Sequence, residues 1–163
     1  MGVSVAAFFG AFLFASLLEY WVHRLMHIYP YVGKKLTQHY HHHRENYGIG
    51  VIKEFRNYLK LSPLVLPTLL ISIPFGVGFI SGAVFYAFFS AYAHQLQHDN
   101  PRRCFWMPMP VHYVHHKYNE WHHNFGLALD IWDRVFGTYH YHEAWDADIQ
   151  SQPLTSPLAI IWW

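Results

Sequence analysis

Two charge-free stretches set the hydrophobic pattern of the chain. Residues 1–18 contain no Asp, Glu, Lys or Arg. With residues 19–27 they form a segment of membrane-crossing length, because about 20 helical residues span the hydrocarbon core. A signal peptide is the alternative, but the stretch lacks a basic leading region and a small-x-small cleavage site. We therefore expect a first membrane helix that continues into His23 and His27.

Residues 61–93 form the second charge-free stretch and are too long for one membrane crossing. Residues that favour turns interrupt its middle, namely Pro74, Gly76 and Gly78. We predict a hairpin of two membrane helices over 59–75 and 79–98. Pro63 and Pro67 predict that the first of these helices is kinked or tilted.

The placement of the cations predicts an orientation in the membrane. All 11 Lys and Arg residues fall within 24–60 or 102–134. Under the positive-inside rule, residues 24–60 and 99–163 lie on the cytoplasmic side, and the amino terminus and the hairpin turn face outward. Every histidine then lies on the cytoplasmic side or at that end of a membrane helix. The apolar, Trp-rich end of the chain fits an interfacial tail, or a segment packed on the domain.

Composition supports an integral membrane protein. Hydrophobic residues make up 53% of the 163 residues and charged residues 13%, against about 25% charged residues in soluble domains. The net charge of +1 gives no sign of a nucleic-acid partner. Cys104 is the only cysteine, so no disulfide forms within the chain. We expect one domain over 1–163, an all-α membrane bundle of about three transmembrane helices with a cytoplasmic, histidine-rich helical cap.

The 15 histidines are the main chemical anomaly of this composition. Ten of them form four motifs, two of the form H-x-x-x-H and two of the form H-x-x-H-H. Spacings of three and four residues place side chains on one face of a helix. The ten are His23, His27, His39, His42, His43, His94, His98, His112, His115 and His116.

These ten histidines predict a shared metal centre. Neutral imidazole is a common ligand for iron, zinc, copper and nickel. One such motif is more often structural, but four motifs in one chain are not. Ten ligands exceed the capacity of one ion and suit two ions that take about four to six each.

Five histidines stand outside the motifs: His41, His122, His123, His140 and His142. A helix would turn His41 away from the face shared by its neighbours. His122 and His123 are candidates for the second shell of a metal site or for the surface. His140 and His142 alternate around a tyrosine, and we expect them to face solvent. There is no H-E-x-x-H motif for a zinc protease and no Gly-rich phosphate loop.

The four motifs in this order resemble the fatty acid hydroxylase/sterol desaturase superfamily of integral membrane proteins. "NFG" at 124–126 and "WDRVFGTY" at 132–139 strengthen the resemblance, which spans about residues 19–139. It implies a non-haem di-iron centre held by the ten histidines, with O2 as co-substrate. It also implies hydroxylation or desaturation of a lipid, whether fatty acyl, sterol, sphingoid or carotenoid. Imidazole also suits zinc, so purified protein could carry zinc instead.

The chain departs from the resemblance in two respects. Many members have four membrane helices, whereas the pattern here predicts three. No fused cytochrome b5-like domain is visible, so we expect a separate electron donor of the ferredoxin or cytochrome b5 type. Glu19, one turn before His23, and Asp99, beside His98, are candidates for the second shell of the centre or for interfacial solvation.

Two other functions compete with a lipid oxygenase. A histidine-rich metal-binding or transport protein without oxygenase activity should place ionisable groups at mid-membrane, and residues 3–18 and 61–93 contain none. A membrane protein stapled by structural zinc needs only four ligands per ion. The ten motif histidines therefore favour the oxygenase.

Overall fold

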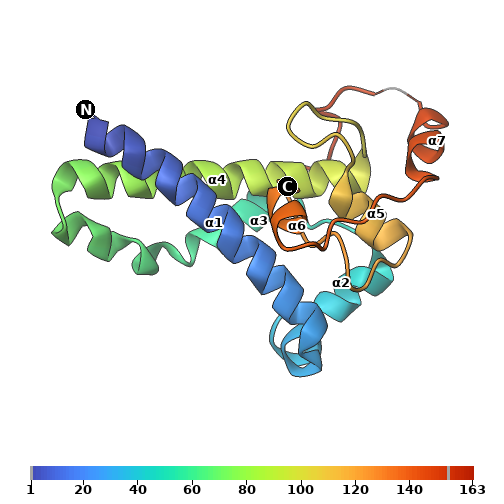
Figure 1. Ribbon diagram of the computed structural model, residues 1–163, viewed down its shortest axis with the longest axis horizontal. Coiled ribbons are helices and arrows are strands. Elements are labelled where there is room, and N and C mark those ends of the chain that lie inside the picture. Colours follow the sequence, from blue (N-terminus) through green and yellow to red (C-terminus); the bar gives the residue numbers. More distant parts are fainter. Residues whose placement is uncertain (1, 154) are drawn as a thin grey trace.

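The computed structural model describes residues 2–153 and 155–163, and within them the regular structure is helical, as predicted (Figure 1). Two helices are long and several are short. In chain order the elements are α1 (Gly2–Ile28), η1 (Val32–Leu36), α2 (His39–Glu45), α3 (Val51–Leu59), η2 (Ser62–Leu64), η3 (Leu66–Leu70), α4 (Ile73–Asp99), α5 (Val111–Lys117), α6 (Ile131–Val135) and α7 (Trp145–Gln150).

The long helices α1 and α4 pack side by side and run in the same direction (Figure 1). Ser4 lies beside Gly78, and Phe8, one turn later in α1, lies beside Gly82, one turn later in α4, so the two helices are parallel. A Cβ on either glycine would lie 2.1–2.2 Å from a main-chain oxygen of α1, so only glycine permits this approach. The parallel packing brings the carboxyl ends of both helices, and the histidines on them, to one end of the molecule.

Both long helices have the length and composition of membrane spans. Each has 27 residues, and an 18-residue window in each is strongly apolar and mostly unburied within the protein. A 27-residue helix is about 40 Å long, which exceeds the hydrocarbon thickness of a bilayer. The structure therefore contains two candidate membrane helices among the described residues, where the sequence predicted three.

The predicted helix over 59–75 is wrong. After α3 the chain forms two short 3₁₀ segments, η2 and η3, each with a proline in its first turn. Proline lacks the N–H that a continuous α-helix needs and clashes with the preceding turn. The predicted turn at Pro74 is wrong as well: Pro74 lies in the first turn of α4, where proline is tolerated, and α4 continues past it.

The segment between α3 and α4 returns along α4 to the starting end of that helix (Figure 1). Leu69 packs directly against Gly76. Leu64 and Leu70 are 75% and 90% exposed. Hydrogen bonds such as Leu64 N to the Leu61 carbonyl and Thr68 N to the Val65 carbonyl satisfy the backbone. A segment with satisfied backbone groups and outward apolar side chains is compatible with a lipid environment.

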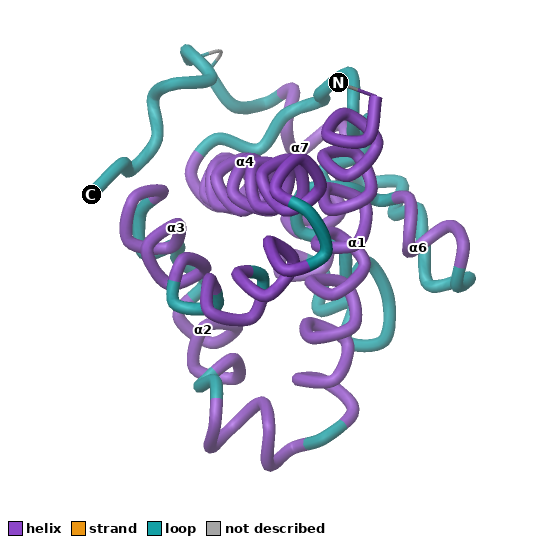
Figure 2. Tube along the Cα trace, turned by 90° about the vertical axis from the view of Figure 1, so that its left-hand side faces the viewer, coloured by secondary structure: helices purple, strands orange, loops and turns teal. Residues whose placement is uncertain are grey.

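The end of the chain packs on α3 and α4. Viewed end-on, α4 lies between α1 and α3 (Figure 2). The carbonyls of Ile161 and Trp162 accept hydrogen bonds from Val51 N and Ile52 N, and so cap the first turn of α3. Asp99 accepts a hydrogen bond from Ile161 N, 2.7 Å away. The apolar tail is thus held against the end of the bundle that carries the histidines.

Candidate metal centre

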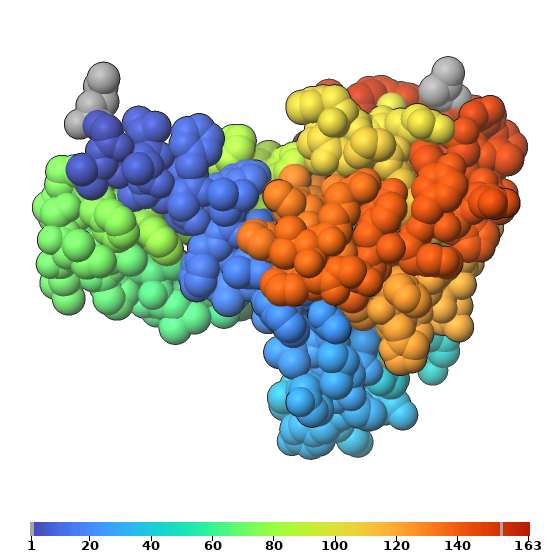
Figure 3. All heavy atoms as spheres, in the orientation of Figure 1, coloured from blue at the N-terminus to red at the C-terminus, as the bar shows by residue number. Residues whose placement is uncertain are grey.

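The fold gathers all ten motif histidines at one end of the bundle. Figure 3 shows the end of α1 and the residues that follow it as a light-blue lobe projecting from the body. From this lobe α2 runs back toward α4, and α5 supplies the last three of the ten histidines. We call the first cluster His23, His27, His39, His43 and His115, whose ligand atoms lie within 4.8 Å of one another. The second cluster is His42, His98, His112 and His116, on the same criterion, with His94 beside His98.

Each H-x-x-H-H motif divides between the two clusters. On α2, His39 and His43 enter the first cluster and His42 the second. On α5, His112 and His116 enter the second cluster and His115 the first. Residues four apart share a helical face, and the remaining histidine of each motif points to the neighbouring site. The rings of His43 and His116 stack with centroids 4.0 Å apart, so the two clusters adjoin.

Within the first cluster, Nε2 atoms approach as ligands of one ion would. The separations are 2.8 Å for His27–His39, 3.0 Å for His39–His43 and 3.1 Å for His27–His115. Nitrogens about 2.0–2.1 Å from a metal ion lie about 2.9 Å apart at right angles and about 3.3 Å apart at tetrahedral angles. The observed separations match coordination at or near right angles.

The second cluster has similar spacings. The Nε2 atom of His98 lies 3.1 Å from that of His94 and 3.2 Å from that of His112. The ring of His42 lies 4.8 Å from that of His98, centroid to centroid. Each cluster thus presents several imidazole nitrogens to a common point.

Main-chain carbonyls orient several of these rings. The Nδ1 atoms of His23, His42 and His115 lie 2.6, 3.0 and 2.7 Å from the carbonyls of Phe125, Tyr47 and His123, respectively. A carbonyl only accepts, so each Nδ1 carries the proton and each Nε2 is free to bind a metal ion.

Several inward nitrogens have no protein partner among the described residues. They include Nε2 of His23, Nε2 of His42 and a ring nitrogen of His116, all buried. A buried nitrogen without a partner is costly, and a bound cation would satisfy it. The donor set therefore fits the metal ions that the sequence predicts.

Burial favours the neutral, metal-binding form of three imidazoles in these clusters. It lowers the pKa of His42 to about 3, of His43 to about 2 and of His115 to about 4. Neighbouring histidines contribute to the low pKa of His42 and His43, because charging one ring disfavours charging the next.

Asp133 fixes the loop that carries two of these carbonyls. Its carboxylate accepts hydrogen bonds from Phe125 N, Gly126 N and the Thr138 hydroxyl at 2.7–2.8 Å. These hydrogen bonds join the "NFG" segment to the "WDRVFGTY" segment. They also position the Phe125 carbonyl beside Nδ1 of His23. Sequence reasoning missed Asp133, although this acidic residue lies within the quoted "WDRVFGTY" motif.

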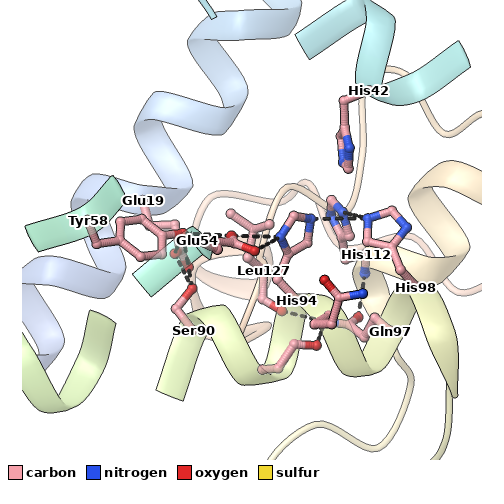
Figure 4. A network of polar contacts seen from close by, with 12 residues as sticks. Glu19, His42, Glu54, Tyr58, Ser90, His94, Gln97, His98, His112 and Leu127 are labelled. Atoms are coloured by element: carbon pink, nitrogen blue, oxygen red, sulfur yellow. Dashed lines mark hydrogen bonds and ion pairs between the residues drawn. The ribbon is translucent and has the colours of Figure 1, made fainter. Parts of the chain in front are cut away.

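A second missed residue, Glu54 on α3, contacts the second cluster (Figure 4). Both of its carboxylate oxygens lie 2.7–2.8 Å from Nδ1 of His94. No spacing in the sequence connects these residues, which are 40 positions apart. A carboxylate on the outer nitrogen of a ligand histidine orients the ring and raises its basicity.

Glu19, predicted beside the centre, reaches it only through Glu54. Its buried carboxylate accepts hydrogen bonds from the hydroxyls of Tyr58, Tyr86 and Ser90. The Tyr58 hydroxyl also lies 3.4 Å from Glu54 (Figure 4). The polar chain therefore runs from the interior of the α1–α4 pair to His94.

The remaining predicted residues lie away from the two clusters. Asp99 accepts hydrogen bonds from Gln95 and the Ile161 amide instead of touching a cluster histidine. His122 is exposed. The His123 ring lies beside Glu120. His140 is exposed, as expected, and its ring also contacts Glu120. His41 contacts Arg44 on the outer face of α2, and His142 stacks on Tyr118.

Comparison with known proteins assigns the family. The family model for fatty acid hydroxylase matches residues 8–138, which include all ten clustered histidines and most of the "WDRVFGTY" motif. No curated protein and no solved structure matches the chain. The match covers most of the chain and agrees with the resemblance read from its motifs. The chain belongs to the fatty acid hydroxylase family.

Proposed function

We propose that this protein is an O2-dependent lipid hydroxylase or desaturase with two iron ions, one in each histidine cluster. The observation that carries the proposal is the pair of adjoining clusters, whose imidazole nitrogens lie at the spacing of metal ligands. When bound, the iron ions would supply the activation of O2 that oxidation of an unreactive C–H bond requires.

The residues of the chain hold and shield such a centre. The outer contacts of His23, His115 and His94 fix the ring orientations before any ion arrives. Trp121 and Phe125 pack on the ring of His27, at centroid distances of 4.3 and 5.5 Å. These apolar walls limit the access of water and so protect reactive species from side reactions.

A membrane-bound substrate fits the arrangement of the helices. α1 and α4 carry four of the ten histidines near their carboxyl ends, so the centre lies where two candidate membrane helices end. We propose that this end faces the cytoplasm, because the Lys and Arg residues gather there. A fatty acyl, sterol, sphingoid or carotenoid substrate would then reach the centre laterally from the bilayer. A separate ferredoxin or cytochrome b5-type protein would supply electrons.

Lipid analysis of an expressing host tests the proposal. Wild-type protein should produce a hydroxylated or desaturated lipid, and His115→Ala should not. His41→Ala is the matched control, because it removes a histidine from the outer face of α2. Expression of all three is compared by immunoblot. Unchanged lipids with well-expressed, iron-loaded wild-type protein would refute the proposal, and accumulation of metal by the host would then favour the transport alternative.

A further inference from the structure

Outside the two histidine clusters, a third group of ligand-type side chains converges on the loop that follows α5. It consists of Glu120, His123 and His140, whose ligand atoms lie within 4.8 Å of one another. The Glu120 carboxylate lies 2.8 Å from Nδ1 of His140 and 3.4 Å from Nδ1 of His123. None of the three belongs to the ten histidines of the proposed iron centre. We propose that they form a separate zinc site.

The ligand set is of a type that zinc binds. Two imidazoles and one carboxylate, with water in the fourth position, form a recognised zinc coordination set. Ligands about 2.0–2.1 Å from a zinc ion lie about 2.9–3.3 Å apart, and the contacts of Glu120 fall close to that range. Softer ions would favour thiolate ligands, and calcium or magnesium would favour an all-oxygen set.

The backbone holds the three side chains in place. The Asn124 side chain donates to the His140 carbonyl and accepts from His140 N, both at 2.9 Å. This pair of hydrogen bonds fixes the segment of His140 beside that of His123. Glu120 N donates to the His115 carbonyl, and His123 N donates to the Glu120 carbonyl. Such preorganisation lowers the entropic cost of binding an ion.

The exposure of the group suits an exchangeable ion. The side chains of His123 and His140 are 46% and 51% exposed, whereas that of Glu120 is 11% exposed. Among the described residues, the ion pairs of Glu120 are with these two histidines and not with Lys or Arg. Water and zinc can therefore reach the site from solvent, while its carboxylate stays largely shielded.

The site adjoins the proposed iron centre through one residue. The carbonyl of His123 accepts the proton of His115 Nδ1, and His115 belongs to the first cluster. Zinc at the third site would join residues 120–123 to residue 140. It would thus fix the position of the His123 carbonyl, which orients His115. The inference does not depend on oxygenase activity, since its ligands and its test concern zinc binding alone.

Zinc titration of the purified full-length protein tests the site. Wild type, Glu120→Gln, His140→Ala and the control His41→Ala are titrated with Zn²⁺ against a competing chelator, and bound metals are counted by mass spectrometry. Both site variants should bind one zinc fewer per chain than wild type, or bind it at least about tenfold more weakly. His41→Ala should match wild type. Zinc that enters the histidine clusters is common to wild type and His41→Ala, so the loss in the site variants is read against both.

Two outcomes would overturn the proposal. One is that both site variants bind as much zinc as wild type with the same affinity. The other is that Glu120→Gln and His140→Ala each lose two or more metals per chain, because these residues would then support the histidine clusters and form no site of their own. The metal retained in the clusters reports that each variant is folded, since those ligands come from helices across the whole chain.

Discussion

Replacement of Glu54 should weaken metal binding at the second cluster alone. Its carboxylate contacts Nδ1 of His94 through both oxygens, and both side chains are only 12% exposed. Glu54→Gln leaves an oxygen that can accept the Nδ1 proton but removes the negative charge. Glu54→Ala removes the acceptor as well and leaves Nδ1 without this partner.

The contact sets the expected magnitudes. Hydrogen bonds to charged groups contribute about 1.5–3 kcal/mol and neutral ones about 0.5–1.5 kcal/mol. Glu54→Gln should therefore cost about 1 kcal/mol, or roughly fivefold in affinity for one ion. Glu54→Ala should cost about 10–100-fold, the usual effect of losing an outer partner of a ligand histidine.

Chelator competition on purified protein measures both effects. We expect one of the two metals bound in the histidine clusters to be released at lower chelator concentration in the order Ala before Gln before wild type. Glu45→Gln is the matched control, because Glu45 pairs with Arg44 on the exposed face of α2. Release of both metals together in Glu54→Gln, or release curves of Glu54→Ala that overlay wild type, would refute the assignment of Glu54 to the second cluster.

Three further predictions follow from the structure. His42→Ala should lose metal and activity while His41→Ala retains both, measured at equal protein level; equal damage would show that α2 presents a different face. The metal-free protein should lose stability as pH falls from 7.5 to 5, measured by thermal unfolding at each pH. His115 has a folded pKa of about 4 against about 6.5 in the unfolded chain, so the unfolded state binds more protons in that window. Each such histidine should lower the free energy of unfolding by about 2 kcal/mol at pH 5. Single cysteines at positions 40 and 118, in a Cys104→Ser background, should label from the same face of the membrane and a cysteine at position 71 from the opposite face; labelling of 40 and 118 from opposite faces would contradict the proposed orientation.

The helical class, the first long apolar helix and the grouping of the motif histidines follow from the sequence itself. Long charge-free runs require backbone groups that are satisfied within the segment, which only a helix provides locally. Histidines three and four residues apart must share or flank a helical face, whatever the rest of the fold does. These are short-range constraints, and they were sufficient to select the ten histidines that the structure brings together.

Tertiary structure decided how those histidines are divided. Because α2 and α5 lie between the two clusters, His42 and His115 each belong to a different cluster from the other histidines of their motif. Spacing along one helix does not determine this division. The contact of Glu54 with His94 joins residues 40 positions apart on helices packed together. The parallel approach of α1 and α4 requires Gly78 and Gly82, and Gly78 belongs to the stretch where local propensity predicted a turn. In each case the deciding contact lies between segments distant in sequence, so its free energy appears only when the helices pack.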